Sequence, residues 1–371
     1  MGNVILAPSD FQILLEKTAR FSACISAKAR EADDVCAIDP SIWNHFHATG
    51  LGTATFPREF GGLALSDGPD LCKIIRQLGA ADLSMARLIE GHLNAVALVC
   101  RYGTVAQIGD MAKSAAAGAL AAVWAADDAC GLHVVSDGAE KRLQGRKVLA
   151  SGAGFVTRPL IAARAKDGQL LLLLNLAPGY KFDLSEWQAL GMKSTATGSV
   201  DFTGHHISKA EIVGKPGDYM RQPHFSGGAW RFCAAHLGAT ERLVELFRAH
   251  LTQSGRGNDP YQLQRLAVCT TSAKTARFWV EEAAKRLGVE DSDPQEVAAF
   301  ANLTRNVTER SALDVMQLVQ RGVGLRAFVR PHDIERICRD LATYLRQPAP
   351  DHAMIDGART ILNSPLSIGD F

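Results

Sequence analysis

The residues of this chain that could do chemistry are its cysteines, a pair of histidines and its glycine-containing turns. No two cysteines form the C-x-x-C pair, and none joins a Cys/His cluster, at the spacing that zinc requires. His205 and His206 lie in a segment with strand-like spacing, where adjacent side chains face opposite sides, so they cannot readily ligate one metal. We therefore predict no metal site and eight free thiols, at residues 24, 36, 72, 100, 130, 233, 269 and 338.

The glycine-containing turns do not match nucleotide or hydrolase motifs. SGAGFVTRP contains only G-x-G, and Pro159 continues it as a strand instead of opening the helix that a dinucleotide site needs. The hydrolase elbow G-x-S-x-G does not occur in the sequence. In TFPREFGGLALS (55–66), Pro57 lacks an N–H and the pair Gly61-Gly62 loses much backbone entropy in a helix. We expect a shaped turn between two helices there.

Length and composition indicate a globular protein with more than one domain. The 371 residues exceed the roughly 250–300 at which one core stops growing. With 40 basic and 39 acidic side chains and no basic block, neither a nucleic acid nor a membrane is expected as a partner. The N-terminus lacks the features of a secretory signal, and the apolar run GQLLLLLNLAPG is too short to span a bilayer. Together with the free thiols, this predicts a cytoplasmic protein.

Three compositional regions must position any site. Helical spacing dominates residues 1–117, short strand-like runs bounded by Gly and Pro fill 118–220, and helical spacing returns in 221–371. Four long helical blocks of the last region can bury their apolar stripes only against one another, which predicts a bundle. In the last block the arginines and acids are expected to lie off the apolar stripe, which consists of Ile334, Ile337, Leu341, Tyr344 and Leu345.

This order of elements resembles the acyl-CoA dehydrogenase family. TFPREFGGLALS looks like the family's P-x-x-x-G-G-x-x-x-S turn, and LQGRKVLASGAGF is similar to its strand pair with N-G-x-K. LGMKSTATGSVDFTGHHIS is similar to its G-x-x-x-S/T segment before a V-x-F strand, and ERICRDLATY to its E-R-x-x-R-D helix. The resemblance covers nearly the whole chain. It implies an α+β fold with an N-terminal helical domain, a middle β-barrel or sandwich domain, and a C-terminal four-helix bundle.

The resemblance also implies a cofactor and partners. It implies FAD between the β domain and the bundle, an acyl thioester of CoA or of a carrier protein as substrate, and a homodimer or homotetramer whose flavin contacts cross the interface. The small residues of GGAWRFCAAHLG are expected to let helices approach closely at that interface. A hydroxyl at Ser151 can hydrogen-bond a flavin edge, whereas Ala126 and Leu132 have no donor. The carried-over flavin positions are Trp124, Ala126, Leu132, Leu149, Ser151, Arg256, Arg321 and Gly322.

The family's dehydrogenation needs a carboxylate that takes the α proton of the thioester while the β hydride goes to the flavin. The two places where members carry that Glu correspond to Pro348 and Gly228, and the nearest titratable groups are Asp351 and His352. We take an FAD-dependent acyl-CoA dehydrogenase-like oxidoreductase as the nominal function. A flavin-dependent monooxygenase of the same fold, which lacks the Glu and uses reduced flavin from a reductase, is the alternative. A non-catalytic scaffold that binds flavin or an acyl carrier is a further alternative.

Overall fold

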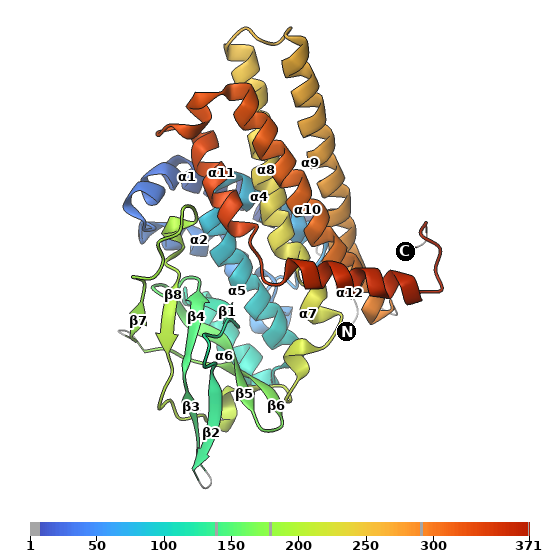
Figure 1. Cartoon of the computed structure of the whole chain (residues 1–371). Helices are drawn as coiled ribbons and strands as arrows, with labels where there is room; N and C mark the ends of the chain where they lie inside the picture. The colour runs from blue at the N-terminus through green and yellow to red at the C-terminus, as the bar shows by residue number, and fades with distance from the viewer. Residues whose placement is uncertain (1–7, 138–139, 178–179, 290–291, 370) are drawn as a thin grey trace.

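The computed structural model describes residues 8–137, 140–177, 180–289, 292–369 and 371 (Figure 1). Two helical parts flank a middle part made of strands, as the sequence predicts. The change from helix to strand falls between Ala116 and Leu120. The first helical part contains α1 (Pro8–Val35), α2 (Ser41–Thr49), α3 (Leu51–Ala54), α4 (Pro69–Ala81), α5 (Leu83–Tyr102) and α6 (Val105–Ala116).

The expected turn at residues 55–66 is confirmed. Pro57 precedes the 3₁₀ turn η1 (Arg58–Phe60), and Gly61 follows it in the left-handed region with φ +83°. Gly62 is required for a different reason, because a Cβ there would lie 2.0 Å from the carbonyl oxygen of Phe56. The turn thus folds back onto Phe56, which is completely buried.

The middle part consists of two sheets. One has six strands in the order β3-β2-β5-β6-β9, with β1 beside β5, and the other has three in the order β4-β8-β7. Pro159 continues β5 as a strand, as the sequence predicts. The strands are β1 (Leu120–Trp124), β2 (His133–Asp137), β3 (Glu140–Gln144), β4 (Arg146–Ala150), β5 (Val156–Ala165), β6 (Gly168–Leu173), β7 (Phe182–Asp183), β8 (Gly198–Asp201) and β9 (Ile212–Val213).

The second helical part contains the four predicted bundle helices and one that the sequence analysis missed. The predicted blocks form α8 (Trp230–Gln253), α9 (Pro260–Leu287), α10 (Pro294–Val323) and α11 (Asp333–Tyr344), preceded by the short α7 (His224–Gly227). The additional helix, α12 (Pro350–Asn363), crosses the bundle and projects away from the β domain (Figure 1).

Small residues of GGAWRFCAAHLG let two helices of one chain approach closely. A Cβ on Gly238 of α8 would lie 1.9 Å from the carbonyl oxygen of Arg76 in α4, and one on Gly79 of α4 would lie 2.1 Å from that of Ala235. The backbones of α4 and α8 are therefore in direct contact within one chain. The expected homo-oligomer stays a prediction.

The helix α11 joins all three parts of the chain. The Arg336 guanidinium lies 3.2 Å from Asp82, which caps α5, and 3.3 Å from Asp340 in its own helix. Asp340 accepts a hydrogen bond from the backbone N–H of Met192 in the β domain, at 2.6 Å. Arg339 pairs with Asp33 of α1 at 2.6 Å. The prediction that the charged residues of α11 lie off its buried stripe was wrong for Arg336 and Asp340, because both are buried as a compensated ionic cluster.

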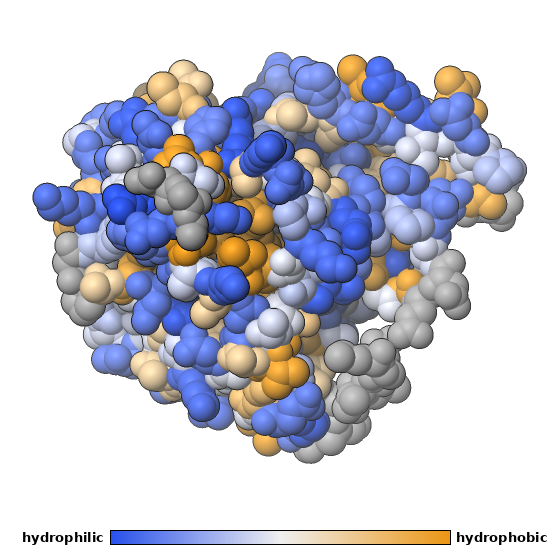
Figure 2. All heavy atoms as spheres, turned by 90° about the horizontal axis from the view of Figure 1, so that it is seen from below, coloured by the Kyte–Doolittle hydropathy of each residue, from blue (hydrophilic) through white to orange (hydrophobic). Residues whose placement is uncertain are grey.

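Polar and charged residues cover most of the face seen from below, and hydrophobic residues gather near its middle (Figure 2). By length and composition α5 is apolar enough to cross a membrane, but 78% of its apolar 18-residue stretch is buried within the fold. The burial of α5 agrees with a core helix of a globular protein.

Candidate active site

A bulge in β4 shapes the part of the β domain where the sequence analysis placed a flavin ring. β4 pairs with β8 at Lys147 and again at Ala150, and the register shifts between these two pairs. Leu149 has φ +52° within this irregularity, and 63% of it is exposed. Bulges commonly re-aim a side chain at a functional edge. The exposed Leu149 is thus available to a ligand on this surface.

Ser151 lies directly after the bulge and belongs to a small group of hydroxyls. Its Oγ lies 3.4 Å from Oγ1 of Thr197, which in turn lies 2.8 Å from Oγ1 of Thr195. The indole N–H of Trp124 donates to the carbonyl oxygen of Ser151 at 3.0 Å. Trp124 therefore fixes the backbone of the residue whose hydroxyl was predicted to meet the flavin.

The other predicted positions on the β domain are structural or partly covered. Trp124 and Leu132 are buried in the core, so neither presents its side chain to a ligand. Ala126 is half-buried. The neighbouring Asp127 lies 2.5 Å from Nζ of Lys147, a side chain that is completely buried. Burial lowers the pKa of Lys147 and the Asp127 carboxylate opposes that shift. Asp127 thus serves as the counter-ion of a buried lysine.

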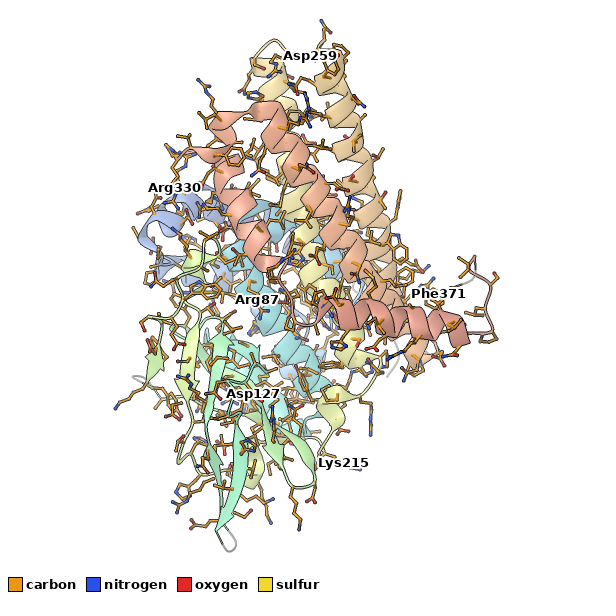
Figure 3. The ribbon with its side chains drawn as sticks, viewed as in Figure 1. Arg87, Asp127, Lys215, Asp259, Arg330 and Phe371 are labelled. Carbon is orange, nitrogen blue, oxygen red and sulfur yellow. The ribbon has the colours of Figure 1, made fainter. Side chains whose placement is uncertain are left out.

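The predicted flavin positions of the bundle lie at its opposite end. Arg256 donates from Nη1 to the carbonyl oxygen of Gly322 at 3.3 Å, so the structure brings these two positions together. Arg321 is exposed. Figure 3 labels Asp259, which lies 3.6 Å from Arg256, at the end of the bundle far from Asp127 and the β domain. Within one chain, Arg256 and Ser151 therefore face different ends of the molecule.

Sequence analysis missed a buried polar cluster between α5, α8 and α11. Nη1 of Arg87 lies 2.7 Å from Oε2 of Glu90, whose side chain is only 4% exposed. The Tyr344 hydroxyl donates to the same oxygen at 3.5 Å. The ring of His236 meets Tyr344 edge-on, with 4.4 Å between the ring centres. Figure 3 shows Arg87 where the bundle and the β domain meet.

Burial sets the protonation states of this cluster. It lowers the pKa of His236 to about 3, and the nearby positive charges of Arg87 and Arg305 act in the same direction. Burial also raises the pKa of Tyr344 well above its ordinary value. Burial would lower the pKa of Arg87, but Tyr344 and Glu90 outweigh it and the pKa is raised. At neutral pH the cluster thus holds a phenol, a charged guanidinium and a neutral imidazole, whose Nε2 has no partner in the part of the chain that the structure describes.

Neither position of the family's Glu holds a carboxylate, and other side chains occupy the space beside both. A Cβ on Gly228 would lie 2.7 Å from Nη1 of Arg231, a buried arginine that pairs with Asp67. The carbonyl oxygen of Pro348 accepts a hydrogen bond from Nη2 of Arg305 at 2.5 Å. Arginines thus stand beside both positions.

The structure places Asp351 and His352 in the first turn of α12. Pro350 occupies the first helical position, where its missing N–H costs nothing. Both side chains are exposed, and neither makes a hydrogen bond or ion pair with the residues that the structure describes. Among the described residues, no partner gives them the setting of a catalytic pair.

The missed cluster left a weak signal in the sequence. Arg87 and Glu90 are three residues apart in an otherwise apolar helix, and charged residues are rarely buried unless they are paired. The two adjacent histidines of the sequence contact different acidic residues. His205 lies 3.0 Å from Glu211, and His206 lies 3.7 Å from Glu140. Among the described residues, no three His, Cys, Asp or Glu side chains gather at a common point.

Comparison with known proteins identifies the family. The acyl-CoA dehydrogenase N-terminal domain matches residues 9–119 and the acyl-CoA dehydrogenase C-terminal domain matches residues 218–345. The two domains together account for more than half of the chain. The chain therefore belongs to the acyl-CoA dehydrogenase family.

Individual relatives have other activities. The chain is 21% identical over 373 residues to a dibenzothiophene monooxygenase of Mycolicibacterium goodii, covering 87% of each chain. It resembles the solved structure of TdsC from Paenibacillus sp. A11-2 with FMN and indole (TM-score 0.80, 18% identity, 94% of this chain and 97% of that one). It also resembles KijD3 with FMN and a dTDP-linked amino sugar (TM-score 0.82, 20% identity, 97% and 95%). The structural likenesses establish the fold.

Proposed function

We propose that this chain is a flavin-dependent monooxygenase, the alternative function, and not an acyl-CoA dehydrogenase. The observation that carries the proposal is the absence of a carboxylate at Pro348 and Gly228, with arginines beside both positions. Glu90 does not replace the missing base, because its Oε2 is already engaged by Arg87 and Tyr344. The names of the relatives, which include a dibenzothiophene monooxygenase, support the same function.

A flavin fits the exposed end of β4. Ser151 offers a hydroxyl, Leu149 offers an exposed apolar side chain, and Trp124 holds the backbone between them in place. FMN-bound structures of the same fold support a flavin cofactor. FAD, which the sequence analysis predicts, is one such cofactor. When bound in its reduced form, the flavin supplies two electrons to O₂, so that one oxygen atom enters the substrate and the other leaves as water.

The chain's own residues would bind the substrate and exclude water at the junction of the three parts. His236 is uncharged at neutral pH and its Nε2 has no partner among the described residues, so it would orient a substrate by hydrogen bonding while the Tyr344 phenol holds Glu90. Arg87, 28% exposed at its side chain, would place a positive charge at the edge of this region. We infer a substrate with a polar acceptor group, and not the acyl thioester expected from the family.

An oligomer would complete the flavin site. Arg256 and Gly322 lie at the far end of the bundle, so they could contact a flavin on Ser151 only from a second copy of the chain. We therefore retain the homodimer or homotetramer as part of the proposal. Sedimentation velocity measures it directly, and a monomer at micromolar concentration would remove Arg256 from the flavin site.

The activity is tested by supplying the protein with FMN, a flavin reductase, NADH and ¹⁸O₂. Dibenzothiophene and indole are suitable first probes. One relative is a dibenzothiophene monooxygenase, and the TdsC structure contains indole. We expect a product heavier by one ¹⁸O atom, detected by mass spectrometry. The same reaction without the protein controls for oxidation by free reduced flavin. Consumption of NADH with hydrogen peroxide as the only product for every probe, at the rate of the protein-free control, would argue for a scaffold.

A further inference from the structure

A cavity of about 270 Å³ lies apart from the candidate active site, between the second half of α1, the segment leading to α2, the start of α5 and the 3₁₀ turn η2 (Lys193–Thr195). Figure 1 shows α1 and α2 on the side of the molecule away from α12. Most of the wall is apolar, and its buried members are Ile25, Ala29, Ile38, Ile42 and Met85.

Two polar side chains of the cavity wall have no partner among the described residues, Ser194 and the exposed Glu31. Ser194 is only 3% exposed, lines the cavity, and its hydroxyl makes no hydrogen bond with the residues that the structure describes. A hydroxyl that no protein group engages is free to bond to a ligand in the cavity.

The other charges around the cavity are compensated. The Asp82 carboxylate accepts from the N–H of Met85 at 2.8 Å and pairs with Arg336 at 3.2 Å. Lys28 and Asp39, which also line the cavity, form an ion pair with each other. The unpaired Glu31 is exposed, where an ion pair contributes little, so a charged ligand would find no buried counter-ion. The surroundings therefore favour an uncharged ligand.

We propose that this cavity binds a small, uncharged two-ring molecule with one hydrogen-bond donor, which Ser194 Oγ accepts. The size follows from the volume, since an apolar cavity of roughly 150 Å³ in an engineered protein takes up benzene. The apolar wall supplies most of the affinity, and Ser194 selects for the donor.

The position of Ser194 connects this site to the β4 surface. The next residue, Thr195, bonds Thr197, and Thr197 contacts Ser151 at the candidate flavin surface. The cavity and that surface thus lie on neighbouring parts of one chain segment. The proposal does not rest on flavin binding, and it holds for the flavin-free chain as well.

Indole and 1-methylindole test the proposal as a matched pair, because they differ in the N–H donor. Isothermal titration of the flavin-free full-length protein should give saturable binding of indole, because the cavity needs no flavin. Binding of 1-methylindole should be roughly 3- to 10-fold weaker, the fold-change for loss of one hydrogen bond. No saturable binding of indole up to its solubility limit would overturn the proposal.

Three variants locate the site. Ala29→Leu fills the cavity and should abolish binding of both probes, whereas Ala27→Leu on the exposed side of the same helix should leave both unchanged. Ser194→Ala should make the affinities for indole and 1-methylindole equal to within about 1-fold. This test remains informative even if Ala29→Leu lowers stability. Unchanged indole binding in a folded Ala29→Leu protein, or an unchanged preference in Ser194→Ala, would place the ligand elsewhere and contradict the proposal.

Discussion

The helix α11 and the beginning of α12 are close in sequence but differ in how they use their charged residues. In α11, Arg336 and Asp340 are buried and contact two other parts of the chain. At the start of α12, Asp351 and His352 are exposed and unpaired among the described residues. The family's E-R-x-x-R-D motif is thus kept where it joins the domains, and the catalytic Glu that follows it in most members is missing.

This difference separates what the fold requires from what one reaction requires. Loss of one partner from a buried ionic cluster destabilises the whole protein, because an uncompensated charge remains. Loss of a catalytic carboxylate removes an activity and leaves the fold intact. The motif is therefore evidence for the fold, whereas function must be argued from the side chains at the junction.

The largest expected effect is at Arg336. Arg336→Met leaves the carboxylates of Asp82 and Asp340 buried without their shared cation, and the free energy of unfolding should fall by about 3–5 kcal/mol. Urea denaturation at pH 8 measures it. The matched control is Arg359→Met, which removes an exposed ion pair of α12 and should change stability by less than about 0.5 kcal/mol. Equal effects of the two variants would refute the contrast between the helices.

The pH dependence of stability should report the same cluster. Burial, and then the Asp82 charge, raise the pKa of Asp340 to about 7, above its unfolded value of 3.8. The folded state then binds the proton more tightly than the unfolded state does. The resulting contribution of Asp340 to the free energy of unfolding is fully present below pH 4 and is lost as the pH rises to 7. Burial raises the pKa of Asp82 as well, with the same sign. Asp340→Asn should flatten the stability profile between pH 4 and 7, and an unchanged profile would contradict the assignment.

A smaller effect is expected where α11 meets the β domain. A Cβ on Gly191 would lie 2.2 Å from the carbonyl oxygen of Arg339, so Gly191→Ala must separate the two backbones. Overpacking of this kind typically costs about 1–3 kcal/mol, measurable by thermal or urea unfolding. Gly257→Ala is the control, because an added Cβ there would meet nothing within 4 Å. A neutral Gly191→Ala would mean that this contact is loose in solution.

The sequence predicted most of the fold, since apolar periodicity and turn residues identify long helices and strands. It could not predict the burial of four charged side chains, Arg336, Asp340, Arg87 and Glu90. Charged side chains are expected to be exposed until their partners on other elements are known. It also missed α12, although Pro350 at its start is a helix signal. At the candidate site, Ser151 and Leu149 were found through the family motif, whereas the cluster around Tyr344 arises only from tertiary contacts.

The smallest effects are expected at the residues first proposed as catalytic. Asp351→Asn and His352→Ala should each change the free energy of unfolding by less than about 0.5 kcal/mol, since both side chains are exposed and unpaired. Product formation in the ¹⁸O₂ assay should also stay within about twofold. A more than tenfold loss of product formation in either variant, with the fold intact by circular dichroism, would show that the substituted residue acts in the active site.

Anaerobic mixing of the flavin-loaded protein with saturated acyl-CoA tests the central claim most directly. A positioned general base contributes roughly 10²–10⁴-fold to a rate, and neither Pro348 nor Gly228 can supply one. We predict that the absorbance of the oxidised flavin stays unchanged for minutes with short, medium and long acyl chains, while dithionite reduces it at once. Bleaching by any acyl-CoA within seconds would show that the chain is a dehydrogenase with a base elsewhere, and would contradict the proposed function.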